Sequence, residues 1–147
     1  MKDVHLVVGV ISIALMSVAG VFGAWRFWRG ESSTWFWRLL RAAQGVIVLQ
    51  VLLGGLLVLL GHKPPSLHVI YGLLPLAVSF IGEQLRVASA QMVLDARGYG
   101  SAAEVGKLAE PEQRSVVLAI VQREMGVMVL AALVIVVLLA RAAATSG

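Results

Sequence analysis

Three histidines are the residues of this chain whose type and spacing best suit chemistry. His5 and His68 each stand four residues before a glycine, Gly9 and Gly72, so both segments read H-x-x-x-G. In a helix, residues four apart lie on the same face, one turn from each other. A glycine at that place leaves room for a flat ring beside the imidazole. The third histidine, His62, stands in a glycine- and proline-rich turn.

Two such helices at matching depth would offer one imidazole to each side of a haem iron. Histidine is a common axial ligand of haem, and helical bundles hold their cofactors between facing helices. A single histidine near a membrane surface is more often only in contact with water, and that alternative stays open for each of the three. A metal site from His62 and His68 is another alternative, although two imidazoles alone do not make a closed zinc site.

Several other chemistries are disfavoured by composition. The chain has no cysteine, which excludes disulfides, thiolate metal sites and cysteine nucleophiles. The hydroxyls of residues 32–34 are expected at the opposite end from the histidines, so no serine–histidine pair is predicted. The net charge of +4 comes from arginines around two loops, without the basic face that nucleic-acid binding needs. We therefore expect no nucleic-acid partner.

The elements that must position these residues are membrane spans. Of the 147 residues, 59% are hydrophobic and 14% are charged, and the mean hydropathy is +0.90. This composition indicates that the chain is surrounded by the lipid bilayer, which is its expected partner. A span needs roughly 20 apolar residues. The sequence predicts one domain, residues 1–147, with spans at about 4–28, 35–60, 66–86 and 112–141. The expected fold is all-α, an antiparallel up-and-down four-helix bundle.

Arginine placement predicts how the bundle is oriented. Arginines flank the loops at 29–33 and 86–114, whereas the turn near residue 63 carries a single lysine. Positive residues mark the cytoplasmic side of membrane proteins, so both termini and all three histidines are expected on the non-cytoplasmic side, in a prokaryotic plasma membrane. The first apolar run, 4–24, exceeds the roughly 7–15 residues of a signal-peptide core, and we interpret it as a retained span.

The longest polar stretch, 86–114, is expected to carry a short cytoplasmic helix. The third helix should continue past the membrane to about Ala96, where glycines interrupt it. Ser101 and Glu104 then form a capping-box pattern that predicts a helix ending near Ala109. The last span should begin at Glu110 and Pro111.

Polar residues inside the spans are expected to bond between helices. Gln44 and Gln50 should each reach a neighbouring helix. Glu83 falls at the cytoplasmic interface, where we expect it and its neighbours to be solvated and to face Arg123 or Glu124. A proton relay is the alternative.

Two stretches resemble a known family. Leu49 to Leu59, LQVLLGGLLVL, is followed by PPSLHVIYG at 64–72, and together they resemble the haem A synthase family. There, a glutamine–leucine–glycine–glycine span precedes a proline-containing outer loop and a haem-ligand histidine. The resemblance covers the first three spans and corresponds to one four-helix, one-haem half of that protein. It implies His68 as one axial ligand and His5 as the other.

The chain departs from that family at two positions beside His5. The family has a glutamate three residues before this histidine, tied to oxidation of the haem methyl group, and Lys2 stands there instead. An arginine usually follows the histidine, and Leu6 replaces it. The departures favour a single-haem, cytochrome b-like protein over haem A synthesis.

The sequence thus predicts a haem b-binding membrane cytochrome that transfers electrons near the outer face, with a quinone or another membrane redox partner. Whether it is an enzyme, and whether it forms oligomers, stays open. The predicted cofactor-binding residues besides the axial ligands are Gly9 and Gly72 beside the ring, Gly54 and Gly55 on the second span, and His62 and Lys63 near the propionates. The alternative is a non-catalytic subunit or assembly factor of a larger membrane complex, in which the glycines are helix contacts.

Overall fold

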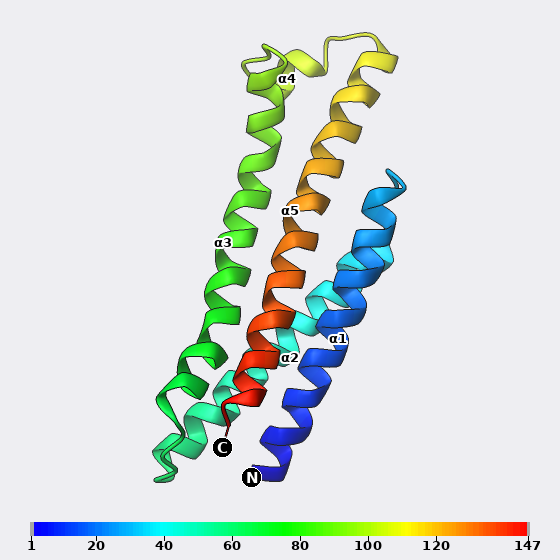
Figure 1. Ribbon diagram of the computed structural model, residues 1–147. Coiled ribbons are helices and arrows are strands. Elements are labelled where there is room, and N and C mark those ends of the chain that lie inside the picture. Colours follow the sequence, from blue (N-terminus) through cyan, green and yellow to red (C-terminus); the bar gives the residue numbers. More distant parts are fainter. Residues whose placement is uncertain (1, 147) are drawn as a thin grey trace.

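The structure is a computed structural model that describes residues 2–146, and it is all-helical, with no strand in that range (Figure 1). The helices in chain order are α1 (Lys2–Trp28), α2 (Thr34–Leu59), α3 (Ser66–Ala96), α4 (Ala102–Val105) and α5 (Glu110–Ala144).

Four of the helices, α1, α2, α3 and α5, are long and apolar enough to cross a membrane. Their outward faces carry many large apolar side chains; Trp28 and Leu59, for example, are 87% and 85% exposed. Exposing such an apolar surface to water is unfavourable, whereas lipid tails solvate it. A helix can lie in lipid because its backbone hydrogen bonds are made within the helix. The arrangement is compatible with an integral membrane protein.

Two pairs of helices build the bundle. The helix α1 packs on α2, α3 packs along α5, and α1 joins the pairs by packing on α5, whereas α2 and α3 touch each other little. The main core lies among α1, α2 and α5 and contains Met16, Phe36, Leu40, Met125 and Ile135. Gly23 makes the close approach possible, because a Cβ there would clash with the Phe36 ring.

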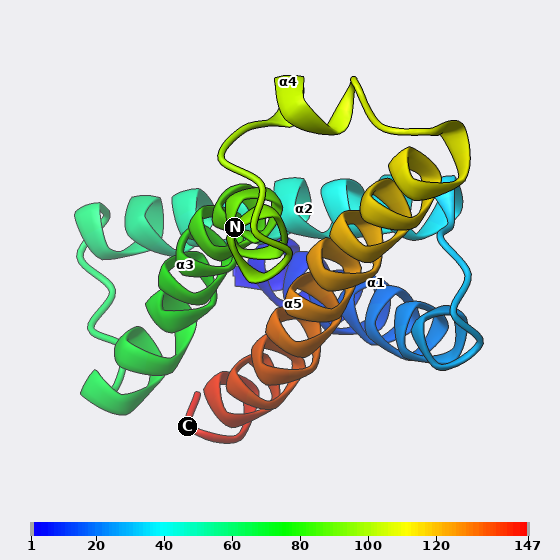
Figure 2. The same cartoon turned by 90° about the horizontal axis from the view of Figure 1, so that it is seen from above.

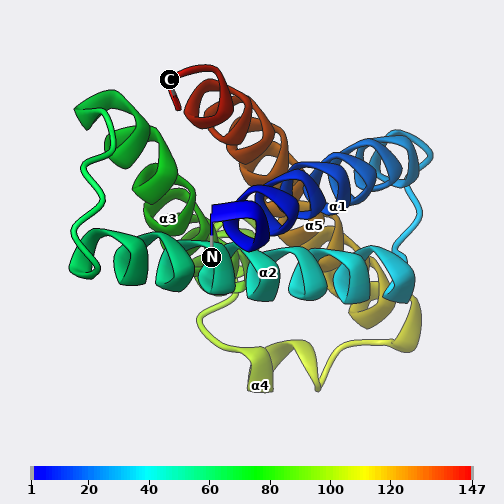
Figure 3. The same cartoon turned by 90° about the horizontal axis from the view of Figure 1, so that it is seen from below.

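The two ends of the bundle differ. Both termini and the turn between α2 and α3 lie at one end, called the termini end below (Figure 1). The α1–α2 loop and α4 lie toward the other, the loop end, where α3 and α5 extend past α1 and α2 (Figures 1 and 2). Seen from the termini end, α2 lies along one side of the bundle, next to α1 and at an angle to it (Figure 3).

The connection from α3 to α5 differs from the prediction in one respect. As predicted, α3 ends at Ala96 and α5 begins at Glu110. The intervening α4 is one turn that stops at Val105, not near Ala109, and the Ser101 side chain makes no capping hydrogen bond. Glu104 instead accepts a hydrogen bond from the backbone N–H of Gly100, at 2.9 Å. A helix as short as α4 has little stability of its own. It is stabilised by packing of Val105 against α3 and α5.

Candidate functional site

His5 and His68 come together at the termini end of the bundle. Their ring centroids lie 6.1 Å apart, with an angle of 68° between the ring planes. Each histidine stands in the first turn of its helix, α1 or α3, so the two helix starts lie at one depth. The structure therefore brings together the two residues of the repeated H-x-x-x-G pattern.

The His68 ring is fixed by the end of α5. Its Nδ1 lies 2.8 Å from the backbone carbonyl of Ala142. A carbonyl only accepts, so Nδ1 carries the proton and Nε2 carries the lone pair. Ala142 stands in the last turn of α5, where carbonyl groups have no partner further along the helix. The carbonyl thus holds the imidazole in the tautomer that can bind a metal through Nε2.

The His5 ring contacts Gln50 of α2. Its Nε2 lies 3.2 Å from the side-chain nitrogen of Gln50, which confirms the predicted bond from this glutamine to a neighbouring helix. An amide nitrogen only donates, so Nε2 of His5 is the acceptor and again carries the lone pair. Within residues 2–146, neither Nδ1 of His5 nor Oε1 of Gln50 has a hydrogen-bond partner, although both atoms are buried. Buried polar atoms without partners are costly, and this cluster keeps two of them.

Two of the predicted glycines make room for this cluster. A Cβ added at Gly54 would lie 3.1 Å from Cε1 of His5, and one added at Gly9 would lie 2.9 Å from the Gln50 side-chain nitrogen. Both distances are shorter than ordinary van der Waals contact. Gly54 and Gly9 therefore set where the His5 and Gln50 side chains sit.

The other predicted residues lie further from the pair. A Cβ at Gly55 or Gly72 would meet no atom within 4 Å, so both glycines border open space. On the turn after α2, Nδ1 of His62 is bonded to the Leu57 carbonyl at 3.1 Å, and Lys63 is exposed. The structure does not bring these two residues into contact with His5 or His68.

Sequence reasoning missed a basic residue beside the pair. The Arg141 guanidinium carbon lies 5.5 Å from the centroid of the Tyr71 ring. Arg141 directly precedes Ala142, and Tyr71 follows His68 by three residues, on the same face of α3. No carboxylate of the described residues lies within 4 Å of Arg141. In the sequence, the only indication of this residue's role was that an isolated arginine stands at the end of an apolar span.

A second polar cluster, the Glu83 cluster, joins α2, α3 and α5 toward the loop end. Both carboxylate oxygens of Glu83 contact the Arg41 guanidinium, with Nη2 donating to Oε2 at 3.1 Å. Nε of Arg86 donates to Oε2 at 2.9 Å, and the Gln44 amide lies 3.4 Å from Oε1. Arg86 also reaches Glu124, at 4.0 Å. The predicted contact with Glu124 is thus present, but the main partner of Glu83 is Arg41.

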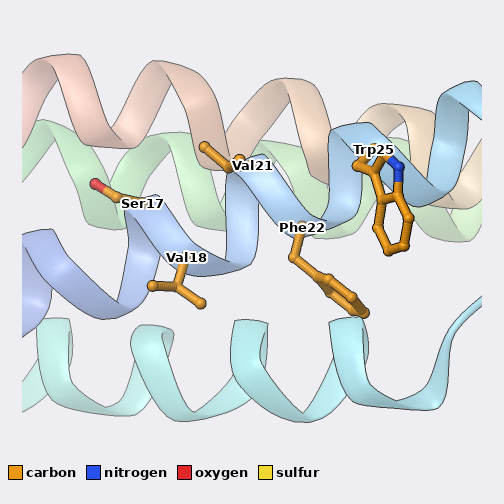
Figure 4. A pocket seen from close by; sticks show the side chains of 5 residues that line it. All are labelled: Ser17, Val18, Val21, Phe22 and Trp25. Atoms are coloured by element: carbon orange, nitrogen blue, oxygen red, sulfur yellow. The ribbon is translucent and has the colours of Figure 1, made fainter.

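Two surface pockets lie away from the histidines. One, of about 510 Å³, is lined by Ser17, Val18, Val21, Phe22 and Trp25 of α1 and faces α2 (Figure 4). Along a helix, its nearest residue is roughly 18 Å from His5. The other, of about 400 Å³, lies at the loop end between the α1–α2 loop and α5. We attach the candidate site to the histidines and not to these pockets, because the first is lined by mostly apolar side chains of a single helix and the second includes neither histidine.

The separation of the two histidine rings can be compared with the separation that one shared metal ion would give. Two metal–imidazole bonds of about 2 Å, plus about 1.1 Å from each nitrogen to its ring centre, separate the ring centroids by roughly 6 Å. The observed separation is 6.1 Å. Within the described residues no group of three or more His, Cys, Asp or Glu side chains could hold a bare metal ion. A ring-centroid separation of this size is compatible with both imidazoles binding one metal ion, and since no third ligand is present among the described residues, a haem iron is a better candidate than a closed metal site.

Comparisons with family models, curated proteins and solved structures found no match to this chain. The resemblance to the haem A synthase family therefore stays a prediction. Function must be inferred from the side chains and their geometry.

Proposed function

We propose that this chain is a haem b-binding membrane cytochrome with His5 and His68 as the axial ligands. The observation that carries the proposal is the 6.1 Å separation of the two ring centroids. His68 already has the arrangement of a metal-ligating histidine, since its Nδ1–H donates to the Ala142 carbonyl. Such a bond orients the ring and makes the other nitrogen more basic.

Two imidazole ligands also indicate what the cofactor would do. Haem iron held by a histidine on each side has no open position for oxygen or substrate, so it supplies one-electron transfer. Within the bilayer, the expected partner is a quinone or another membrane redox protein. His5 must release its hydrogen bond from Gln50 to become a ligand. Gly72, four residues after His68 on the same helix, would leave room beside the ring, because a Cβ there would meet no atom within 4 Å.

The same proposal includes an orientation. The helices α1, α2, α3 and α5 cross the membrane up and down, with the loop end in the cytoplasm and the termini end outside a prokaryotic plasma membrane. Arginines 26, 29, 38 and 41 near the α1–α2 loop support this orientation. Single cysteines at positions 32 and 63 test it with an impermeant thiol reagent. Intact cells should label position 63, and preferential labelling of position 32 would reverse the orientation.

The experiment that tests the proposal is haem titration of the purified protein and of three histidine variants. Wild type should bind one haem per chain with a low-spin absorption spectrum. His5→Ala and His68→Ala should each lose the low-spin spectrum, since the pair then lacks one ligand. His62→Ala is the matched control, because its ring is bonded to the Leu57 carbonyl on the turn, and it should keep the wild-type spectrum.

A protein that binds no haem would favour the alternative, a structural subunit or assembly factor. An unchanged low-spin spectrum in both His5→Ala and His68→Ala would show that other residues bind the haem.

A further inference from the structure

Arg141 and Tyr71 form a cationic site beside the histidine pair. The guanidinium stacks on the phenol ring at 5.5 Å, and Arg141 is exposed at the termini end. The face of a guanidinium makes no hydrogen bond, so the N–H donors, which lie in the plane of the guanidinium, stay available. Among the described residues no carboxylate lies within salt-bridge distance of it.

The position of Arg141 is fixed relative to His68. The neighbouring residue, Ala142, accepts the hydrogen bond from the His68 ring, and Tyr71 is one turn along α3 from His68. A group held by His68 would therefore have in its neighbourhood a cation without a carboxylate partner among the described residues. The anionic groups that haem carries at its edge are two propionate carboxylates, and guanidinium binds carboxylates with paired hydrogen bonds.

We propose that Arg141, stacked on Tyr71, binds a haem propionate. The proposal rests on the haem-binding function above. It replaces the sequence-based expectation for His62 and Lys63 with a residue from the opposite end of the chain. His62 already uses Nδ1 on the Leu57 carbonyl, and Lys63 is exposed on the turn, whereas Arg141 is linked to His68 through Ala142.

A comparison of two ligands tests this pairing. Haem and haem dimethyl ester share the same iron and ring, but the ester has no propionate charge. Both are titrated into the same detergent-solubilised protein at low salt, where exposed ion pairs are least screened. Wild type should bind haem about fivefold more tightly, relative to the ester, than Arg141→Gln does. The affinity for the ester should be the same in both proteins.

Two matched variants serve as controls. Arg38 stacks on Trp35 at 5.4 Å, so Arg38→Gln removes an equivalent cation–π pair at the loop end and should leave the ligand preference unchanged. Lys63→Gln should also leave it unchanged, and Arg141→Lys should keep part of it, since the charge remains.

The possible results separate the two proposals. If Arg141→Gln keeps the full preference for haem, or if Lys63→Gln abolishes it, the assignment to Arg141 is wrong. If wild type binds haem and its ester equally, no propionate pairing exists, yet haem binding stands. If wild type binds neither ligand, the proposed function fails, and this inference fails with it.

Discussion

The bundle contains two polar clusters at different depths, and they differ in how fully their hydrogen bonds are made. In the Glu83 cluster, the carboxylate receives donors from Arg41, Arg86 and Gln44. In the cluster at the termini end, His5 and Gln50 share one hydrogen bond, and each keeps a buried atom without a partner in residues 2–146.

This difference separates a structural role from a binding role. The Glu83 cluster links α2 to α3 where these helices otherwise touch little, and with Glu124 its two arginines face two carboxylates. The histidine cluster gains little stability from its own contacts, since unpaired polar atoms oppose burial. Its unpartnered polar atoms could still take part in binding a ligand. The following predictions test this contrast, from the largest expected effect to the smallest.

Replacing Glu83 by Gln should destabilise the fold and leave haem binding unchanged. The substitution leaves Arg41 and Arg86 without their shared carboxylate, and we expect a loss of about 2 kcal/mol of unfolding free energy. Thermal unfolding in detergent measures it. Glu124→Gln is the control: its carboxylate lies 4.0 Å from Arg86, and the loss should stay below about 1 kcal/mol. If Glu83→Gln instead abolished haem binding in protein that remains folded, the two clusters would not have separate roles.

Replacing Gly54 by Ala should weaken haem binding about tenfold, because displacing a tightly packed side chain costs roughly 1–3 kcal/mol. The new Cβ would lie 3.1 Å from Cε1 of His5 and would displace the ring from its present position beside His68. Gly45→Ala, on the same helix and away from the histidines, is the matched control, since its Cβ would meet nothing within 4 Å. Alanine favours the helix over glycine at both positions, so loss of helix stability cannot explain a difference. Equal haem titrations of the two variants would contradict the assignment of His5.

Replacing Gln50 by Ala should strengthen haem binding about fivefold, the weight of one ordinary hydrogen bond. The Gln50 amide donates to the Nε2 lone pair of His5, and the iron would use the same lone pair. Gln44→Ala should have no effect on haem affinity, because Gln44 belongs to the Glu83 cluster. Weaker haem binding by Gln50→Ala would mean that the amide supports the ligand and does not compete with it.

The helix boundaries could be predicted from the sequence because local signals set them. Prolines at 64 and 65 precede the start of α3 at Ser66, and Pro111 stands in the first turn of α5. The length of α4 could not be predicted in this way. The capping-box pattern at Ser101 and Glu104 was present, but the carboxylate bonds to Gly100, and Gly106 follows the last residue of the turn. The Glu104 carboxylate could accept a hydrogen bond from the backbone N–H of Ser101 or of Gly100, so the motif alone did not determine where the helix ends.

Much of the site depended on how the helices rotate against one another, which no local pattern encodes. The shared depth of His5 and His68 followed from their places in the first turns of two spans. The partners Ala142 and Gln50 come from α5 and α2, and only the packed bundle shows which faces of these helices turn inward.

The partners of the interface charges illustrate the same limit. Arg123 was a predicted partner for the charges near Glu83, but its guanidinium contacts the Met92 sulfur at 3.3 Å. Arg41 of α2 takes that place.

Electron paramagnetic resonance of the ferric, haem-loaded protein tests the central claim most directly, because it reports both axial ligands of the iron at once. The ring centroids of His5 and His68 lie 6.1 Å apart, and if both rings bind the iron as proposed, the protein should give a low-spin signal typical of two imidazole ligands. His68→Ala, loaded in the same way, should lose that signal and give a high-spin one. A high-spin signal from the wild-type protein would show that His5 and His68 do not bind the same iron.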